Sequence, residues 1–485
     1  MRPCLAIVLL LMYVPAWGAT YYVDATAGND SNVGTATNYA WKSIYKVNTS
    51  SFSAGDQILF KSGEVWREQL TVPSSGSAGN PITFGKYGAG ALPKIDGSGS
   101  RTRTLLVNGI SYVAISDIQF TGSATSIQGS VYVYNSNHII LDRISVDSNI
   151  GFAGIFIEGT GGSNIVSNST VHNTTHATSD RGCGILVDGT AGSNTITNNT
   201  IYSNSAAGIK LAMYTATNNN TISGNTVYLN GGAGISIHTS CANNIVQNNR
   251  VYANGQLVAD RYGIDLFKVG NNNVVRYNTT YSHNYISMDA GGIRFDAEPG
   301  SIFGTGNKIY YNLIYNERNG IHLLGCSNAS VYNNTIYNSG VAGIWNHGSY
   351  ANNNAIKNNI VYTAGTSLVF NNDSTNSVYD YNDYYDTNMT NKFNWNGTAS
   401  STLAAWRTAS SQDVHSISSN PEFLTAGSDF RLLSTSPSIN AGTDVLLPAD
   451  YSGNSVPFGS APDIGAFEYQ GIRLPSPPSN LRFHK

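Results

Sequence analysis

The chain has 485 residues, of which only 11 % are charged, and its formal net charge is −3 at pH 7. So small a charge does not indicate nucleic acid or an anionic membrane surface as a partner, and we expect neither. Apolar residues make up 41 % of the chain and recur periodically, which indicates a folded protein rather than a disordered one.

The first segment, residues 1–19, has the features of a secretion signal peptide. Arg2 provides a basic start, residues 5–14 form an apolar run, and Ala16 and Gly18 offer small residues for cleavage. No later apolar run is long enough to span a bilayer. We therefore expect an exported protein, extracellular or periplasmic, without a membrane span.

The next segment, residues 20–100, differs in texture from the repeats that follow it. We expect it to form an N-terminal capping region and the first coils. From residue 101 to residue 362 a Gly-Ile pair then recurs eight times, at spacings of 23 to 30 residues. The pairs are Gly154-Ile155, Gly184-Ile185, Gly208-Ile209, Gly234-Ile235, Gly263-Ile264, Gly292-Ile293, Gly320-Ile321 and Gly343-Ile344. A period this short and this constant is typical of a solenoid, in which equivalent residues stack in columns.

Each repeat contains three short segments with the pattern of β-strands. The Gly-Ile segment alternates with period two, as in residues 208–211, and two β-branched segments follow around an asparagine, as in residues 220–228. Asn and Gly suit the corners because both tolerate left-handed backbone. The sequence therefore predicts an all-β fold, a single-stranded right-handed parallel β-helix with a core of Ile, Val and Leu.

The repeat fades after residue 362. Residues 363–470 are rich in tyrosine and should form an irregular C-terminal closing region, while the Pro-rich residues 471–485 read as a linker or tail. The cysteines that follow the signal peptide are too far apart along the coils for disulfides, so we expect buried or free thiols. We expect a monomer.

Phrases at both ends of the solenoid resemble a known group of proteins. They are Tyr21-Tyr22-Val23-Asp24, Pro93-Lys94-Ile95-Asp96-Gly97, Asn420-Pro421-Glu422-Phe423 and Asp463-Ile464-Gly465-Ala466-Phe467-Glu468-Tyr469. These stretches are similar to secreted right-handed parallel β-helix proteins of the pectate-lyase-like superfamily. The resemblance covers most of the mature chain and implies its fold. The superfamily contains lyases, hydrolases, epimerases and non-enzymes, so the reaction stays open.

The register of the Gly-Ile strand predicts which side chains face outward, because the isoleucine points inward and the next residue outward. One outward column reads Phe156, Leu186, Lys210, Ser236, Asp265, Arg294, His322 and Trp345. A second, two residues further along, reads Glu158, Asp188, Ala212, His238, Phe267, Asp296, Leu324 and His347. A third, three residues before each glycine, reads Arg181, Ser205, Gly231, Asp260, Asp289, Glu317 and Gly340.

The third column places three acids on successive coils. Carboxylates stacked about 5 Å apart repel one another unless a cation, a proton or arginines intervene. The predicted cluster comprises Asp260, Asp265, Asp289, Arg294, Asp296 and Glu317, with Arg261, Tyr262, Lys268, Arg318 and His322 beside it. In a chain with so few charges, this concentration predicts a functional site. The alternative is an acid–base ladder that only solubilises the strand face.

Three reactions fit such a cluster: β-elimination with a base and a cation, hydrolysis with two carboxylates, and C5 epimerisation. The predicted catalytic residues are Lys268, Arg294, Asp265, Asp289 and His322, with Lys268 or Arg294 as the base. The predicted substrate-binding residues are Lys210, Tyr262, Asp296, Arg318 and Trp345. Asp260, Asp289 and Glu317 could hold Ca²⁺ through oxygen ligands. No organic cofactor is expected.

Some of these residues also have plainer interpretations. His238, His322 and His347 fit exposed members of the ladder better than metal ligands. Trp345 is equally suited to stacking on a sugar and to packing under the closing region.

Two short motifs add to the resemblance. Tyr262-Gly263-Ile264-Asp265 is similar to the opening of the alginate C5-epimerase motif, and Asp289 lies where that family has a second aspartate, but Leu266-Phe267 replaces its Pro-His continuation. Residues 263–267 also resemble calcium-dependent pectate lyases, although Arg261 and Tyr262 stand in place of their paired aspartates.

The sequence as a whole predicts a secreted protein that acts on an extracellular polysaccharide. A lyase cleaving an acidic, uronate-containing polymer by β-elimination, at the face formed by residues 208–345, is the favoured interpretation. The rival is a non-catalytic surface or matrix protein that binds glycans. A glycoside hydrolase or a C5 epimerase on the same fold is the further alternative.

Overall fold

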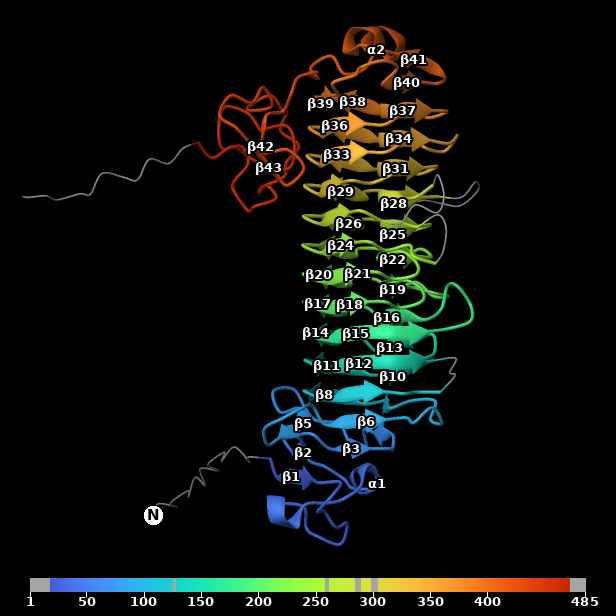
Figure 1. Ribbon diagram of the computed structural model, residues 1–485, viewed down its shortest axis with the longest axis vertical. Helices are drawn as coiled ribbons and strands as arrows, with labels where there is room; N and C mark the ends of the chain where they lie inside the picture. The colour runs from blue at the N-terminus through green and yellow to red at the C-terminus, as the bar shows by residue number, and fades with distance from the viewer. Residues whose placement is uncertain (1–17, 125–127, 258–260, 284–288, 298–303, 472–485) are drawn as a thin grey trace, which may run out of the picture.

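The computed structural model describes residues 18–124, 128–257, 261–283, 289–297 and 304–471. The chain winds into an upright solenoid, with its N-terminal coils at the bottom of Figure 1 and its C-terminal coils at the top. Three long sheets, named A, B and C below, run along it, and each coil adds one strand to each sheet in that order. The predicted parallel β-helix is confirmed. Most of the predicted signal peptide lies outside the described residues.

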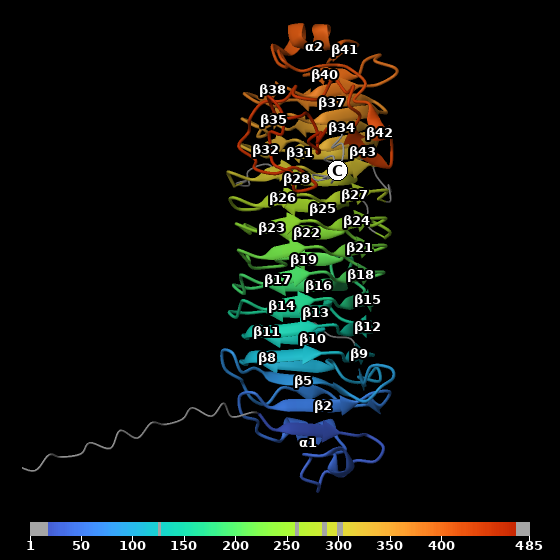
Figure 2. The same cartoon turned by 90° about the vertical axis from the view of Figure 1, so that its left-hand side faces the viewer.

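The strands of the three sheets are short and stack in three parallel columns (Figure 2). Sheet A contains β1 (Thr20–Val23), β2 (Gln57–Lys61), β5 (Ile82–Tyr87), β8 (Ser111–Ser116), β11 (Asn137–Asp142), β14 (Ile165–Ser167), β17 (Thr195–Thr197), β20 (Thr221–Ser223), β23 (Ile245–Gln247), β26 (Val274–Arg276), β29 (Lys308–Tyr310), β32 (Ser330–Tyr332), β35 (Ala355–Lys357) and β38 (Val378–Asp380). Sheet B contains β3 (Val65–Trp66), β6 (Lys94–Asp96), β9 (Gln119–Thr121), β12 (Ser145–Ile150), β15 (Thr170–Thr175), β18 (Thr200–Tyr202), β21 (Thr226–Tyr228), β24 (Arg250–Tyr252), β27 (Thr279–Tyr281), β30 (Leu313–Tyr315), β33 (Thr335–Ser339), β36 (Ile360–Ala364) and β39 (Asp383–Tyr385). Sheet C contains β4 (Leu70–Thr71), β7 (Leu105–Asn108), β10 (Gly129–Tyr134), β13 (Ala153–Glu158), β16 (Cys183–Asp188), β19 (Ile209–Leu211), β22 (Ile235–His238), β25 (Tyr262–Phe267), β28 (Gly291–Asp296), β31 (Asn319–Leu324), β34 (Ala342–His347), β37 (Ser367–Asn372), β40 (Phe393–Trp395) and β41 (Thr398–Ser400).

The core is a continuous stack of apolar side chains between the sheets. In sheet C, Ile235 pairs with Ile264 and Ile264 with Ile293, and all three are fully buried. Because the side-chain direction alternates along a strand, burying these isoleucines turns their neighbours outward. The residues that follow these isoleucines, Ser236, Asp265 and Arg294, therefore lie on the outer face of sheet C.

Buried asparagines form the corners between the sheets. The column that leads into sheet B consists of Asn199, Asn225, Asn249, Asn278, Asn312, Asn334, Asn359 and Asn382. In each step Nδ2 donates to Oδ1 of the next asparagine at 2.9–3.0 Å. A buried amide needs such partners, so the ladder explains why asparagine recurs at this corner.

The corner between sheets B and C carries a shorter ladder. Asn204, Asn230 and Asn254 continue one another, and His283 takes the next place, where Nδ1 accepts from the backbone N–H of Asn254 at 3.1 Å. Glu317 takes the place after His283. Tyr281 pairs with Tyr315, and His283 and Glu317 each lie two residues beyond the paired tyrosine. The imidazole Nε2 of His283 lies 3.5 Å from Glu317 Oε1.

Tyrosines stack along the outer face of sheet B. Tyr202, Tyr228, Tyr252, Tyr281 and Tyr315 succeed one another with ring centroids 4.8–5.0 Å apart. The C-terminal segment, which includes β42 (Phe423–Thr425) and β43 (Asp429–Leu432), lies beside the upper coils (Figure 1). Its Phe430 packs against Tyr315 and Tyr337, so this segment covers the upper part of the stack.

Helical elements lie near the two ends of the solenoid. The 3₁₀ helix η1 (Thr37–Tyr39) and helix α1 (Ile44–Asn48) belong to the N-terminal end, where Ile44 and Val47 are buried. Helix α2 (Leu403–Ser410) covers the top, with Trp406 stacked on Phe393 at 5.5 Å. No helix among the described residues is long and apolar enough to cross a membrane.

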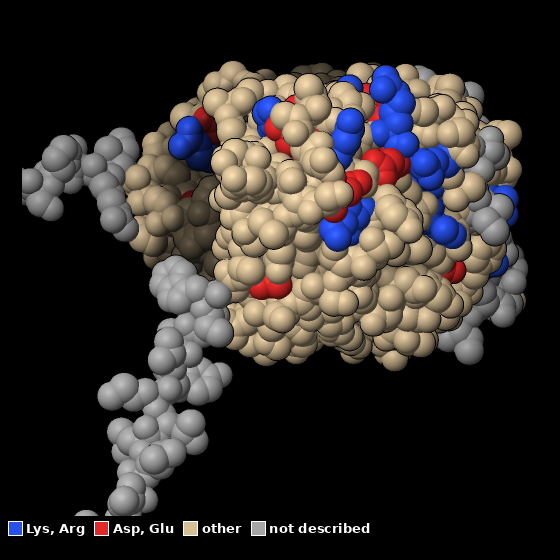
Figure 3. All heavy atoms as spheres, turned by 90° about the horizontal axis from the view of Figure 1, so that it is seen from below, with Lys and Arg blue, Asp and Glu red and all other residues tan. Residues whose placement is uncertain are grey.

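Two expectations about the solenoid can be compared with the structure. The coils continue beyond residue 362 through β37, β38 and β39, because Leu368-Val369 replaces the Gly-Ile pair without breaking the strand. Cys183, Cys241 and Cys326 are buried free thiols, as predicted. Seen from the N-terminal end, the surface is mostly uncharged, with basic and acidic side chains close together on one side (Figure 3).

Candidate functional site

The outer face of sheet C carries the predicted columns in the predicted register. Lys210 pairs with Ser236, Ser236 with Asp265 and Asp265 with Arg294. The column continues through His322 to Trp345. Side chains of strands β19 to β34 thus follow one another at the strand spacing of roughly 4.8 Å, which makes this face the place to look for a site.

Arg294 on β28 is the centre of a buried charge cluster. Its guanidinium donates to both carboxylate oxygens of Asp265, from Nε at 2.9 Å and from Nη2 at 3.1 Å. Nη1 lies 3.2 Å from Asp296 Oδ2 and 3.4 Å from Asp289 Oδ2. The ring of Tyr262 lies 4.9 Å from the guanidinium carbon. One cation therefore faces three carboxylates, which is a formal charge of −2.

Asp289 is the carboxylate through which this cluster meets solvent. Its side chain is 36 % exposed, whereas those of Asp265 and Asp296 are 2 % and 7 % exposed. The hydroxyl of Tyr262 donates to Asp289 Oδ1 at 2.9 Å. That hydroxyl also lies 2.6 Å from Nδ1 of His322. Since the tyrosine's only proton goes to Asp289, His322 must donate from Nδ1.

The surroundings set the protonation of this network. Burial opposes ionisation of Asp289, but contacts with His322, Arg294 and Tyr262 outweigh it, so the pKa of Asp289 lies below its usual range. Burial lowers the pKa of His322, which keeps the imidazole neutral near pH 7. Burial also raises the pKa of Tyr262. Asp289 is thus ionised at neutral pH and is held by the neutral side chains of Tyr262 and His322.

Arg294 cannot serve as the predicted base. Burial alone would lower its pKa, but the charges of Asp265 and Asp296 and the hydrogen bonds to Asp265 raise it further. A guanidinium held this firmly keeps its proton and acts as a fixed positive charge. Its role is to hold the acids together.

Aromatic side chains border the cluster on its C-terminal side. Trp345 stacks on His322 with ring centroids 4.5 Å apart and an angle of 7°, and it stacks on His347 at the same distance. Phe370 meets Trp345 edge-on at 5.8 Å. Burial lowers the pKa of His347 to about 4, so it is uncharged at neutral pH. This arrangement fixes the orientation of His322.

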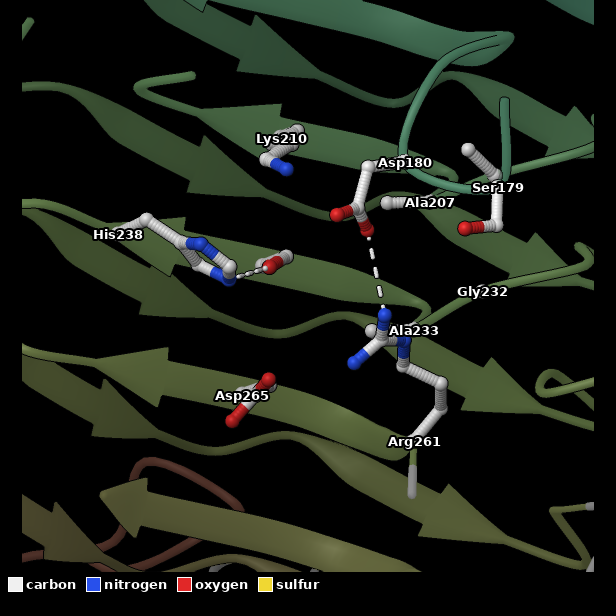
Figure 4. Close-up of a pocket in the computed structure, with 11 residues that line it drawn as sticks. Ser179, Asp180, Ala207, Lys210, Gly232, Ala233, His238, Arg261 and Asp265 are labelled. Carbon is white, nitrogen blue, oxygen red and sulfur yellow. Dashed lines mark hydrogen bonds and ion pairs between the residues drawn. The ribbon is translucent and has the colours of Figure 1, made fainter. Parts of the chain in front are cut away.

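A hollow lies on the N-terminal side of the cluster (Figure 4). Its lining residues are Ser179, Asp180, Ala206, Ala207, Lys210, Gly232, Ala233, Ser236, His238, Arg261 and Asp265. Arg261 Nη2 binds Asp180 Oδ1 at 3.2 Å, and Ser236 Oγ lies 2.7 Å from His238 Nε2. Asp265 belongs both to this hollow and to the Arg294 cluster, so the two form one continuous surface.

The third predicted column is wrong for Glu317. Its side chain is fully buried beside His283 in the corner ladder, whereas Asp289 faces Tyr262 and His322 on the outside. The connection before Asp289's strand spans residues 282–290, but the one after Glu317's neighbour Tyr315 spans only 316–318. Residues three positions before the glycine of each Gly-Ile pair therefore do not all lie on the same side of the coil.

The remaining predicted residues occupy separate positions. Lys268 follows β25, and its ammonium lies 4.8 Å from the centre of the Phe267 ring. Arg318 is half-buried between β30 and β31 and makes no ion pair within the described part of the chain. Asp260 lies outside the described residues. The roles suggested for these three residues remain predictions.

Asp180 was not among the predicted site residues. It belongs to the connection between β15 and β16 and reaches Arg261, 81 residues further along the chain. The length of that connection, residues 176–182, was the available signal. A long loop beside a predicted outer column can cover it.

Comparisons with known proteins give one family and several enzymes of related fold. Residues 94–296 are similar to the family described as periplasmic copper-binding protein (NosD). A segment of 182 residues is 29 % identical to the lacto-N-biosidase of Bifidobacterium longum subsp. longum, and it covers 30 % of this chain and 11 % of that protein.

Solved structures show the same architecture. The GH136 lacto-N-biosidase of Eubacterium ramulus aligns with a TM-score of 0.50 and 16 % identity, over 76 % of this chain and 64 % of that one. The complex of XylC with xylose aligns with a TM-score of 0.54 and 12 % identity, over 92 % and 98 %. The resemblance to the β-helix superfamily is confirmed for the fold. The chain spans less than two thirds of both lacto-N-biosidases.

The described residues do not fit a copper site. No group of three or more His, Cys, Asp or Glu side chains within them is placed to hold a metal ion. His322 and His347 stack on one another at 5.0 Å, and Nδ1 of His322 is already occupied by Tyr262 and Asp289. The predicted Ca²⁺ site stays a prediction, because it includes Asp260.

Proposed function

We propose that this protein hydrolyses glycosidic bonds in an extracellular glycan on the outer face of sheet C. The observation that carries the proposal is the Asp289 carboxylate, which is ionised, partly exposed and held by Tyr262 and His322. Glycoside hydrolysis passes through a transition state with positive charge on the sugar ring. A fixed carboxylate beside the anomeric carbon is the group that stabilises such charge.

The electrostatics of the whole cluster favour this chemistry. Arg294 offsets one of three neighbouring carboxylates, so the surface that Asp289 presents is net negative. A preorganised negative site stabilises a developing oxocarbenium ion at no cost in reorganisation. The same surface repels a bare uronate carboxylate unless a cation or a nearby lysine neutralises it.

The second carboxyl that hydrolysis requires must donate a proton to the leaving oxygen. Asp265 does not suit this role, because burial would raise its pKa but the charge and hydrogen bonds of Arg294 lower it and keep it ionised. Asp260 is the candidate that the sequence offers, and only substitution can test it. The similarity to lacto-N-biosidase, which is a glycosidase by name, supports a hydrolase on this fold.

The test follows two signals from one incubation. Purified protein is mixed with a panel of neutral and acidic polysaccharides, and both reducing ends and absorbance near 235 nm are recorded. Reducing ends without absorbance support hydrolysis. Asp289→Asn should lower the rate by roughly 10³-fold or more while the unfolding midpoint stays close to that of the native protein. A variant with native turnover would sink the proposal.

β-Elimination on an acidic polysaccharide is the second candidate. It is favoured by the hydrogen bond between Tyr262 and His322, since a tyrosine–imidazole pair can exchange a proton with a substrate. Absorbance near 235 nm that rises together with reducing ends would establish this reaction instead. Loss of that signal with EDTA and its return with Ca²⁺ would support a metal site that includes Asp289 but not the buried Glu317.

Absence of both signals across the panel would favour a glycan-binding protein without catalysis. In that case the face of β19 to β34 should still retain the polysaccharide in a pull-down, and Asp289→Asn should weaken retention. Export and a monomeric state are part of the proposal, and fractionation of the producing cells and light scattering of the purified protein would test them.

A further inference from the structure

Lys210 is a buried cation without a partner. It lies on β19 in the outward column of sheet C, yet it is only 6 % exposed, because the hollow of Figure 4 surrounds it. Among the described residues its ammonium makes no hydrogen bond and no ion pair. The side chain as a whole is nearly buried, but its ammonium opens into the hollow, where the folded chain supplies no counter-charge.

The other buried Lys and Arg side chains among the described residues each pair with at least one carboxylate. Arg294, 6 % exposed, is surrounded by three carboxylates. Lys392, 7 % exposed, pairs with Asp386 at 3.1 Å and donates to the carbonyl oxygen of Gly365 at 3.0 Å. Lys210 has no such carboxylate partner, and of these three cations it alone lines the hollow.

We infer that this hollow receives the anionic group of a substrate sugar, a carboxylate or sulfate, with Lys210 as its counter-ion. The inference rests on the proposed action on a glycan and names its substrate class. Ammonium–anion hydrogen bonds are strong where water is excluded. The anion would supply the partner that the folded chain does not.

The hollow is small, with a cavity volume of about 20 Å³, so it admits an anionic group while the sugar ring stays outside it. Ala207, Gly232 and Ala233 keep its floor free of bulky side chains, whereas the next residue in the column of Ala207 and Ala233 is Tyr262. Ser236 and His238 add hydrogen-bonding groups. Burial lowers the pKa of His238 to about 4, so its imidazole is neutral and contributes polarity rather than charge.

A second cation, Arg261, lies at the opening of the hollow. Arg261 binds Asp180, whose side chain is 63 % exposed, so this pair is the outer wall of the hollow. Figure 4 shows Lys210 and Asp265 at opposite ends and the Arg261–Asp180 pair at one side. Asp265 is already neutralised by Arg294 and lies two strands from Lys210, roughly 10 Å away. It therefore competes little with a bound anion.

The subsite is displaced from the proposed reactive group along the solenoid. Strand β19 lies three strands before β28, or roughly 14 Å along the axis. The strand spacing is similar to the length of one sugar unit, so a glycan lying along sheet C would place its anionic residue about three units from the bond at Asp289. At this distance Lys210 can bind an anionic group of the substrate without neutralising the negative charge around Asp289.

The test measures melting temperature and binding with galacturonate and glucuronate, against galactose and glucose at equal ionic strength. Both uronates should raise the melting temperature of the native protein more than the neutral sugars do. Lys210→Met keeps the length of the side chain and removes its charge. It should weaken uronate binding about tenfold or more and leave neutral sugars unaffected.

A second readout needs no ligand. Because the folded chain supplies no ion pair for Lys210 to lose, Lys210→Met should not melt below the native protein. Lys308→Met, at an exposed lysine of sheet A, is the matched control and should change neither melting nor uronate binding. Equal uronate binding by native protein and Lys210→Met, no preference for uronates, or a lower melting temperature for Lys210→Met would each overturn the inference.

Separate variants test the proposed hydrolysis and the proposed binding of an anionic group. Asp289→Asn should bind uronates as the native protein does. Uronate binding that depends on Lys210 in a protein that cleaves no glycan would leave the subsite intact and remove only the hydrolase proposal.

Discussion

Replacing Arg294 by methionine should destabilise the protein strongly and make its stability depend on pH. The guanidinium makes two hydrogen bonds to Asp265 and ion pairs to Asp289 and Asp296. Asp265 and Asp296 are 2 % and 5 % exposed. Removing one partner of a buried charge pair costs about 3–5 kcal/mol, because the other charge stays buried without compensation. We expect a loss in this range at pH 8.

The sign of the pH dependence follows from Asp265. In the native protein its folded pKa is depressed, so its contribution to stability is present above the unfolded value of about 3.9 and is lost only as pH falls through the folded pKa. Without Arg294 the buried carboxyl should have a raised pKa. The variant then loses stability as pH rises from about 4 through that raised value.

Urea denaturation followed by circular dichroism at pH 5 and pH 8 measures both effects. Arg294→Met should be less destabilised at pH 5 than at pH 8, and adding Asp265→Asn should remove most of that difference. A loss below about 1 kcal/mol, or an equal loss at both pH values, would refute the idea that Arg294 is held mainly by charge.

Three further predictions concern the ladder, the thiols and the site. Asn225→Ala removes the acceptor of Asn199 and the donor to Asn249 and to the carbonyl of Ile196, so it should cost about 3–4 kcal/mol in urea denaturation. Asn198→Gly, at an exposed neighbour with φ of 56°, should cost less than about 1 kcal/mol, and equal losses would contradict the ladder's role. Burial raises the pKa of Cys183 to about 11 and of Cys241 to about 12, so a thiol reagent at pH 8 should label them only after unfolding, and rapid labelling of native protein would be inconsistent with the fold. Tyr262→Phe removes the proton donated to Asp289, so the pKa of Asp289 should rise and the acid limb of kcat/KM should move to higher pH. It should also lower kcat/KM about tenfold, and an unmoved acid limb would separate Tyr262 from the reaction.

The strand-borne half of the site could be predicted from the sequence. Lys210, Asp265, Arg294 and His322 follow a Gly-Ile pair at a fixed distance within one strand. Alternation inside a strand is exact to the residue, and stacking of repeats turns it into a column. The same argument yielded the buried isoleucines of the core.

The loop-borne half could not be predicted in this way. Asp289 and Glu317 both lie two residues before a strand of sheet C, yet one faces outward and the other is buried. The connections from sheet B that lead to them differ in length, and the repeat does not fix that length. Asp180 joins the hollow through a contact that no local pattern encodes.

The interior of the solenoid changes at the same coils as its outer face. The corner ladder between sheets B and C is asparagine at Asn204, Asn230 and Asn254, and then becomes His283 and Glu317. Asp289 and Arg294 stand on these same two coils or between them. Thr174 precedes Asn204 in this column and Ser339 follows Glu317, so asparagine is not its only residue. What distinguishes the coils of Asp289 and Arg294 is that the corner side chains there, His283 and Glu317, are ionisable.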